Sequence, residues 1–570
     1  MSATSTRVAR FWLCFSLGLG LGCDKRSDEA LQTPEPGAQS DTASVDAQLA
    51  ELEEPARRGA ALRELSRLAF ETAEGGDLEA IAAFRAKVLP AIAGHWAEAT
   101  PGERLQLLTI ALRLPGPEAE PLWSVALASG NPDEVALALE GVERGGTTGA
   151  GAAMLERVEA ELAGFEAEDQ ARARMLLQLI EGLGDIRYRE AVEPLIRLLA
   201  GPDQARPVQR VAITALGRIG DPRAVDTLLA VQFRIPDTPG TLSIGERALR
   251  AIGAIGEAAL PGVLVAFAGG NQQLNRLAED VGLDPSIVRL SMVRQLGIIG
   301  SPRATQPLLD AFPRAGCGST PALADEDAQS ERERERAFFA HALGFIADPA
   351  AVPALCECID NGNPGPLYEI VNALGRIGGP EASACLATVL ERGRYDADLA
   401  ASGEELMIRW EAVRWAVIAA APGDHPALVE RMAKLSEPVR ARVEAEQLDI
   451  GLGLLVECGE RLECYEGVLA DPARHPFERE RAAFEVARAA QPGDRERAAL
   501  LAGGFAAFEP SVRINMAWLA GKVAAGQACP ACIAALDEVM RAEELTKPKT
   551  MQAAWMMARQ TIDKAHAGEP

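Results

Sequence analysis

The stretch "ALGRIGDPRAV", which runs from Ala215 to Val225, decides the fold. Its first half has apolar residues at helical spacing and ends at Gly220, a residue type that adopts the left-handed conformation which stops a helix at little cost. Asp221 can cap a new helix, and Pro222 suits the first turn of that helix because no amide hydrogen is needed there. The stretch therefore predicts two antiparallel helices joined by a tight elbow.

Near copies of this elbow recur along the chain. The copy "ALGRIGGPEAS" begins at Ala373, and others begin at Ala251, Gln295 and Ala342. Their mean spacing of about 40 residues is typical of a repeat made of two helices. The elbow residues combine a glycine inside the first helix, a stop at its end and a residue that starts the second helix. We assign this role to Gly217, Gly220, Asp221, Pro222, Gly297, Gly300, Pro302, Gly344, Pro349, Gly375, Gly378 and Pro380.

Composition supports a helical fold. Of the 570 residues, 48% are hydrophobic but only 5% are aromatic, so alanine and other small residues must fill much of the core. Small apolar residues suit closely packed helices better than sheets, which favour aromatic and β-branched residues. We therefore predict an all-α fold, an α-solenoid over residues 49–565 with its clearest repeats in residues 175–392.

The repeat resembles HEAT repeats, in particular the short bacterial repeats that also occur in phycobilisome (PBS) lyases. The residues that carry the likeness are Leu216, Gly217, Ile219, Gly220, Asp221, Pro222, Ala224, Val225 and Leu228, with their copies. The resemblance implies an armadillo-like helical superhelix of stacked hairpins. It specifies no activity, because such repeats serve as scaffolds for many partners.

The N-terminus has the pattern of an export signal. Arg7 and Arg10 precede a short apolar run that is followed by Cys23 and a polar segment. This arrangement resembles the lipobox of bacterial lipoproteins, which implies a signal peptide over residues 1–22 and lipidation of Cys23. Residues 23–48 are polar and read as a flexible tether. A plain secretory signal or a membrane anchor is the alternative.

These features predict a protein of the bacterial cell envelope that is lipid-anchored and faces the periplasm. The membrane contact is expected only through the N-terminal lipid. Asp24 directly follows Cys23. An aspartate at this place retains lipoproteins at the inner membrane in some bacteria but not in all, so we do not choose between inner and outer membrane.

The net charge restricts the class of partner. The chain carries 82 acidic and 57 basic residues, for a formal charge of −25. Such a surface repels phosphate backbones, and the sequence shows no local basic run, so nucleic acid is not an expected partner. Binding to anionic lipid surfaces is disfavoured for the same reason, whereas a cationic partner is permitted.

Eight cysteines follow Cys23, and an even number in an exported chain indicates disulfides. They are Cys317, Cys356, Cys358, Cys385, Cys458, Cys464, Cys529 and Cys532. A bond between Cys458 and Cys464 is expected to staple an elbow. Either Cys356 or Cys358 can reach Cys385 in the next repeat, and Cys317 is expected to pair with the one left over.

Cys529 and Cys532 form a CxxC motif at an expected helix start. A helix N-terminus lowers the pKa of a thiol, so a thiol-redox envelope protein is one alternative function. The surroundings lack the strand–helix–strand context of thioredoxin-like sites, and a structural disulfide is the preferred interpretation. Zinc binding would need four ligands, and no second CxxC or nearby histidine pair is present.

Motifs for enzymatic chemistry are lacking in the sequence. We find no phosphate-binding loop, nucleophile elbow or histidine metal motif, so we assign no catalytic residue, no metal ligand and no cofactor. The alternating run "ERERER", from Glu331 to Arg336, is expected to form a solvated helix face, with a docking site for a basic partner as the alternative. Trp410, Trp415, Trp518 and Trp555 are expected to be core or interface anchors.

The preferred function is therefore a non-enzymatic scaffold that binds protein partners through its HEAT-repeat surface. The alternative that the resemblance allows is a lyase or other enzyme subunit related to the PBS-lyase proteins.

Overall fold

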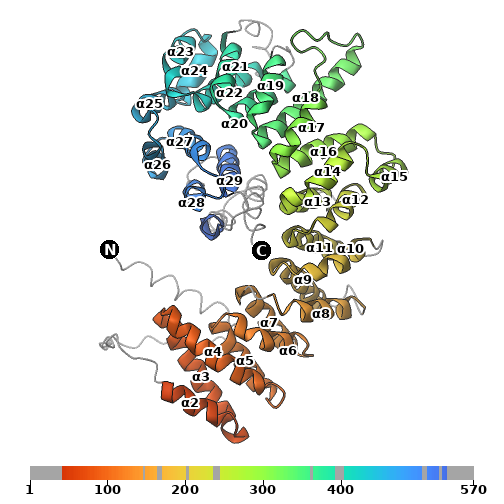
Figure 1. Ribbon diagram of the computed structural model, residues 1–570, viewed down its shortest axis with the longest axis vertical. Helices are drawn as coiled ribbons and strands as arrows, with labels where there is room; N and C mark the ends of the chain where they lie inside the picture. The colour runs from red at the N-terminus through yellow and green to blue at the C-terminus, as the bar shows by residue number, and fades with distance from the viewer. Residues whose placement is uncertain are drawn as a thin grey trace.

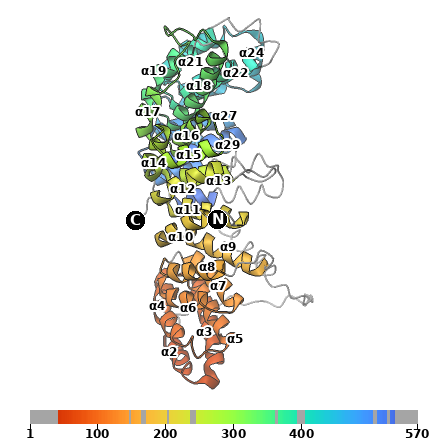
Figure 2. The same cartoon turned by 90° about the vertical axis from the view of Figure 1, so that its right-hand side faces the viewer.

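The computed structural model describes residues 42–145, 148–163, 170–200, 205–234, 244–359, 364–391, 404–503, 510–524 and 529–535. Within these ranges all regular structure is helical, and no strand occurs. The helices stack as antiparallel pairs into a curved array that bends back on itself (Figure 1). In the view turned by 90° the array is narrow, so most of its curvature lies in the plane of Figure 1 (Figure 2). The predicted all-α solenoid is confirmed.

Each repeat has a first and a second helix. The first helices are α3 (Pro55–Gly75), α5 (Pro101–Arg113), α7 (Pro132–Gly145), α9 (Gln170–Asp185), α11 (Arg206–Ile219), α13 (Ile244–Ile255), α16 (Pro285–Ile299), α18 (Glu326–Ile346), α20 (Pro364–Ile377), α22 (Glu404–Ala419), α27 (Pro476–Ala489) and α29 (Pro510–Ala524). The second helices are α4 (Leu78–Gly94), α6 (Glu120–Leu127), α8 (Gly151–Ala163), α10 (Val192–Ala200), α12 (Val225–Arg234), α14 (Leu260–Phe267), α17 (Thr305–Asp310), α19 (Val352–Glu357), α21 (Pro380–Glu391), α23 (His425–Met432), α26 (Leu462–Ala470) and α28 (Arg495–Gly503). Helix α15 (Gln272–Asp280) is an insertion, and α24 (Glu437–Ala445) and α25 (Asp449–Cys458) together take the place of one first helix.

The elbow between α11 and α12 shows how the sequence ends one helix and starts the next. Gly220 has a φ of 77° and donates its amide hydrogen to the carbonyl of Leu216, which closes α11. The Asp221 carboxylate accepts a hydrogen bond from the amide of Arg223 at 3.0 Å. Pro222 then opens the short 3-10 helix η3 (Pro222–Ala224), which leads directly into α12. The elbow thus satisfies backbone groups that helix ends would otherwise leave without partners.

The other elbows follow the same pattern with different residues. Gly300 and Gly378 each have a φ of 70° and close α16 and α20. At the end of α18 the left-handed position is filled by Ala347, with a φ of 52°. Ser301 and Asp348 replace Asp221 as acceptors for the next turn. The geometry of the elbow is therefore kept while its residues vary.

A glycine–alanine seam joins successive first helices. A Cβ atom placed on Gly217 would lie 2.8 Å from the Cα of Ala251, and one on Gly344 would lie 2.8 Å from the Cα of Ala373. Real Cβ atoms do not approach a backbone so closely, so only glycine allows this spacing. The further pairs of this kind are Gly184–Ala215 and Gly297–Ala342.

The seam explains which layer lies inside the curve. Helix α11 packs closely on α9 and α13, whereas α12 touches α10 and α14 only slightly. Close approach on one side of a stacked array and wider spacing on the other bend it toward the close side. The first helices accordingly line the inner side of the curve, and the second helices the outer side (Figure 1).

We expect Gly344→Ala to destabilise the protein by about 1–3 kcal/mol, because the added methyl group would force α18 and α20 apart. Gly453 in α25 is the matched control, since it is exposed and a Cβ there meets nothing within 4 Å. Gly453→Ala is expected to stabilise by about 0.5–1 kcal/mol through helix propensity. Urea unfolding of both variants measures the difference, and equal effects would argue against the seam.

The N-terminal boundary differs from the prediction. Helix α2 (Thr42–Glu51) begins within the segment that was expected to be a tether, so that expectation is wrong from Thr42 onward. Val45 and Leu52 are buried against the first repeat, with Leu49 partly buried beside them. The residues between these three apolar positions are mostly polar or small, so the sequence of this segment did not indicate a helix. Residues 1–41, and with them Cys23, lie outside the described residues.

One stretch of the described chain is long and apolar enough for a membrane span by composition. It runs over Ile244–Phe267 with a mean hydropathy of 1.5. The structure divides it into α13 and α14, with the turn η4 (Gly256–Ala259) between them, and half of it is buried inside the array. The apolar character is therefore that of a core hairpin.

Candidate functional site

The inner side of the first helices presents a row of polar and charged residues. On α11 these are Arg210, Thr214 and Arg218, which lie at helical spacing away from the buried face. Arg218 pairs with Asp185 of α9 and lies 3.5 Å from Glu181 on the same helix. Such pairs run from one repeat to the next, so the inner side forms a continuous polar surface over several repeats.

Polar pairs between successive first helices also occur further along the array. Arg294 of α16 contacts Glu246 of α13, with an N–O distance of 3.1 Å. His341 Nδ1 of α18 lies 3.0 Å from the Glu369 carboxylate of α20. The glycine–alanine seam does not continue at Gly375 in α20. This glycine faces the ring of Trp415, whereas the earlier glycines of the seam face an alanine. The regular seam therefore ends at α22.

The C-terminal helices turn back onto the inner side of the array at this place. Trp518 of α29 donates its indole hydrogen to the carbonyl of Phe345 in α18 at 3.1 Å, although the two residues are 173 positions apart. Lys522 Nζ donates to the carbonyl of Ala347 at 3.4 Å. Ala347 caps the C-terminal end of α18. Arg481 and Arg488 of α27 donate to carbonyls at the end of α22, at 2.8 and 2.9 Å.

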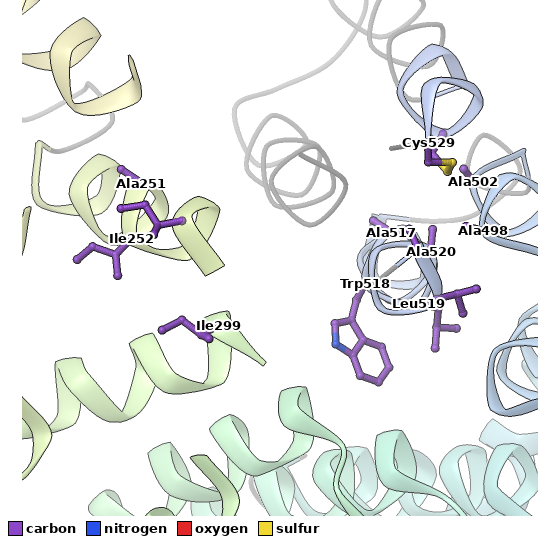
Figure 3. Packing of buried hydrophobic residues seen from close by; sticks show 14 of the residues in the cluster. Ala251, Ile252, Ile299, Ala498, Ala502, Ala517, Trp518, Leu519, Ala520 and Cys529 are labelled. Carbon is purple, nitrogen blue, oxygen red and sulfur yellow. A yellow bond between two sulfur atoms is a disulfide. The ribbon is translucent and has the colours of Figure 1, made fainter. Parts of the chain in front are cut away.

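These contacts place cations at the negative ends of helix dipoles, where they are favoured. Burial lowers the pKa of Lys522, and the charge of Asp348 opposes that effect. Trp518 projects from one side of α29, while Leu519 and Ala520 lie on the side of that helix toward Ala498 and Ala502 of α28 (Figure 3). We call the contact of α27 and α29 with α18 and α22 the clasp.

A buried charge pair lies in the core of the clasp. Arg414 of α22 pairs with Glu480 of α27, which is 1% exposed, and Asn515 of α29 donates to the same carboxylate at 3.4 Å. Burial alone would lower the pKa of Arg414, but the charges of Glu480 and Glu411 outweigh it and raise that pKa. The Phe484 ring packs edge-on against Trp415, with the ring centres 5.5 Å apart. The clasp is thus a packed interior with a charge pair inside it.

The tryptophan predictions can be placed on this arrangement. Trp415 is 1% exposed and Trp518 is 8% exposed, and both serve as anchors of the clasp. Trp410 is partly buried, with the Arg442 guanidinium 5.2 Å from its ring centre. Trp555 lies outside the described residues.

The eight cysteines that follow Cys23 lie in four bonded pairs. Cys317 pairs with Cys358, Cys356 with Cys385, Cys458 with Cys464, and Cys529 with Cys532, with Cα–Cα distances of 4.4, 5.8, 5.4 and 5.2 Å. The sequence left open whether Cys356 or Cys358 pairs with Cys317. Cys358 is the partner, because it is fully buried beneath the loop that carries Cys317. Cys529 and Cys532 are 2% and 0% exposed. A redox-active thiol must be accessible, so this burial favours a structural bond over the redox alternative.

We expect non-reducing peptide mapping to recover these four pairs. Replacing Cys317 and Cys358 by serine is expected to cost about 2–4 kcal/mol, because the bond closes a long loop in the unfolded chain. The bonded residues are 41 positions apart there and only 6 apart for Cys458 and Cys464, whose loss is expected to cost less. Recovery of free thiols in the oxidised protein would contradict the pairing.

The charged run "ERERER" differs from its prediction in part. Arg332 is exposed and pairs with Glu335 at 2.6 Å, as a helix face predicts. Glu335 and Arg336, however, are buried, and Arg336 donates from Nε to the carbonyl of Pro313 at 2.8 Å. The solvated-face expectation is therefore wrong for the end of the run, where Arg336 holds the inserted loop that follows α17.

The sequence shows no local basic run, but the fold brings several arginines together on the inner side. Arginines on α11, α13 and α16 lie close together on the inner side, although they are far apart in the sequence. Burial, followed by the charges of Arg210 and Arg250, lowers the pKa of Arg247. This cluster could not be recognised as a basic run in the sequence, because each repeat contributes only one or two of its arginines.

Within the described part of the chain, no group of three or more His, Cys, Asp or Glu side chains is arranged to hold a metal ion. Several charged groups on the inner side instead form pairs between neighbouring repeats, such as Arg218 with Asp185 and Arg294 with Glu246. Such a surface is suited to recognition through hydrogen bonds and charge.

Comparisons with known proteins identify the repeat. The family model for HEAT repeats matches residues 166–232 and 320–407, so these parts of the chain are similar to HEAT repeats. The hairpins between them, from α13 to α17, have the same architecture. A search of curated proteins finds no match.

Among solved structures, the comparison finds importin beta and Kap121p. A crystal structure of importin beta is 14% identical with a TM-score of 0.36, covering 92% of this chain and 78% of that one. The structure of Kap121p bound to Pho4p is 12% identical with a TM-score of 0.32, covering 92% and 75%. At this identity and score the likeness indicates no partner for this chain.

Proposed function

We propose that this protein is a lipid-anchored scaffold of the bacterial cell envelope, which binds a protein partner through the inner surface of its HEAT repeats. HEAT-repeat solenoids are typical of protein-interaction scaffolds, since their stacked hairpins offer an extended surface. The observation that carries the proposal is the row of polar side chains on the inner first helices. Residues such as Thr214 and Arg294 lie outside the apolar core there.

The cysteines support the envelope location. Disulfides form and persist in oxidising compartments such as the bacterial periplasm. Four bonded pairs in one chain suit that compartment, and the N-terminal signal pattern suits the same route. A scaffold mounted on a membrane by a short tether would hold its partner close to that membrane.

We expect Cys23→Ser to abolish attachment of fatty acid to the protein, because this thiol is the proposed site of lipidation. Metabolic labelling with a radioactive fatty acid measures the effect. Cys14→Ser is the control, since Cys14 belongs to the proposed signal peptide and would be removed with it. Labelling of Cys23→Ser as strong as that of the wild type would contradict lipidation at Cys23.

The scaffold itself is tested by crosslinking in intact envelopes, followed by affinity enrichment of the tagged full-length chain. The expected result is a specific protein that is recovered with this chain in repeated experiments. The comparison sample is an envelope preparation in which the tag is carried by an unrelated lipoprotein. Failure to recover any partner that is absent from that sample would count against the scaffold.

A further inference from the structure

Four arginines gather on the inner side of three successive first helices. They are Arg210 on α11, Arg247 and Arg250 on α13, and Arg294 on α16, and we call them the arginine patch. These helices lie next to each other along the inner side of the curve (Figure 1). Glu246 contacts two members of the patch, at 3.4 Å from Arg250 and 3.1 Å from Arg294.

Some N–H donors of the arginine patch have no hydrogen-bond partner among the described residues. Within the described part of the chain, the Nε of Arg247 and the Nη1 of Arg250 are buried and have no hydrogen-bond partner. Arg250 has a side chain that is only 14% exposed, so water reaches it poorly. Each guanidinium carries five N–H donors in a rigid plane. Buried donors without partners destabilise a fold, and their presence needs an explanation.

Charge makes the arrangement more unusual. Arg247 faces Arg210 and Arg250, and this proximity of like charges adds to the effect of burial in lowering its pKa. The chain as a whole has a formal charge of −25, so acidic residues to neutralise the patch are abundant elsewhere in the sequence. A cluster of cations kept together at a cost to stability indicates a binding site for an anion.

Carboxylates fit this site better than a polyphosphate chain does. Arginine binds a carboxylate through two parallel hydrogen bonds, and the patch offers such groups on neighbouring helices. A long nucleic acid would also lie along much of a chain whose formal charge is −25, and that charge repels it. A short acidic segment of a protein needs to contact only the patch itself.

We propose that the arginine patch binds a run of aspartate or glutamate side chains on a protein partner. The inference rests on the proposed scaffold function and deepens it, because it names the part of the inner surface and the chemistry of the segment that it recognises.

The test is a binding titration with the full-length chain. The probe is a fluorescent decapeptide of glutamate, and the glutamine decapeptide is its neutral counterpart. We expect saturable binding of the glutamate peptide that weakens as salt concentration rises, and at least a tenfold loss of affinity in the double variant Arg247→Gln/Arg250→Gln. The control Arg197→Gln/Arg303→Gln removes two exposed arginines from other surfaces and is expected to change affinity less than twofold.

Three outcomes would overturn the inference. The first is a wild-type protein that does not distinguish the glutamate peptide from the glutamine peptide. The second is a control variant that loses as much affinity as the patch variant. The third is a single-stranded DNA decamer that binds more tightly than the peptide, which would assign the patch to nucleic acid.

Thermal unfolding separates binding from a structural role. Arg247→Gln is expected to keep or raise the melting temperature, because it removes a cation that faces two others. A clear fall in melting temperature would instead make Arg247 a structural residue and overturn the inference. If the patch variant still recovers the same partner from envelopes as strongly as the wild type, the inference fails and the scaffold stands. If no partner is recovered with any variant, the proposed function itself fails.

Discussion

Replacing Trp518 by alanine is expected to release α29 from α18 and to destabilise the clasp by about 3–5 kcal/mol. The indole is 8% exposed, donates to the carbonyl of Phe345 and packs its ring against the rings of Phe345 and Phe484. Alanine would remove all of these contacts at once. Because a solenoid is stabilised mainly between neighbouring repeats, the loss should stay near the C-terminal end.

Hydrogen–deuterium exchange measures this result. In Trp518→Ala, amides of α27 to α29 should exchange faster, whereas those of α9 to α16 should keep their protection. Trp123→Ala is the control, since Trp123 is fully buried in α6, far from the clasp in Figure 1. That variant should lose protection around α5 to α7 instead. Uniform loss of protection in both variants would contradict a local clasp.

A conservative variant separates the hydrogen bond from the packing. Trp518→Phe keeps an aromatic ring in place but cannot donate to the Phe345 carbonyl. Its expected cost is about 0.5–1.5 kcal/mol, the usual net value of one hydrogen bond. A cost as large as that of alanine would mean that ring packing contributes little.

Replacing Glu480 by alanine is expected to destabilise the protein by about 3–5 kcal/mol, because it leaves the Arg414 guanidinium buried without its partner. Glu480 is 1% exposed and accepts hydrogen bonds from Arg414 and Asn515. Glu411, 3.5 Å from Arg414, is a weak substitute, because burial raises its own pKa and disfavours its charged form. Chemical denaturation at pH 7 gives the free energy of unfolding.

The matched control for Glu480 is a carboxylate in an exposed ion pair. Glu446 lies 2.8 Å from Arg442, and both side chains are largely in solvent. Glu446→Ala is expected to cost less than about 1 kcal/mol, as surface pairs generally do. A Glu480 variant no more costly than this control would show that the clasp does not depend on its charge pair.

The elbows could be predicted from the sequence because they are local. Gly220, Asp221 and Pro222 each act through their own backbone geometry or through an atom two residues away. The glycine–alanine seam was half visible, since Gly217 was expected to allow close packing of helices. Its partner Ala251 became evident only when the spacing between repeats was known.

The clasp and the arginine patch could not be predicted in this way. Trp518 and Phe345 meet because many small rotations between repeats add up over the array, and a sequence pattern does not give those rotations. Arg210 and Arg294 come together for the same reason. The pairing of Cys317 likewise depends on the path of the loop after α17, which Arg336 fixes from inside a run that looks solvated in the sequence.

The most direct measurement of the central claim, that the inner first helices are the binding surface, is site-specific photo-crosslinking in intact envelopes. A photoreactive amino acid is placed at Thr214 or Ala254 on the inner side, and at Glu193 or Thr227 on the outer helices. We predict that both inner positions crosslink the same partner and that both outer positions do not. Crosslinking that is equally strong from the outer positions, or that occurs only there, would contradict the account.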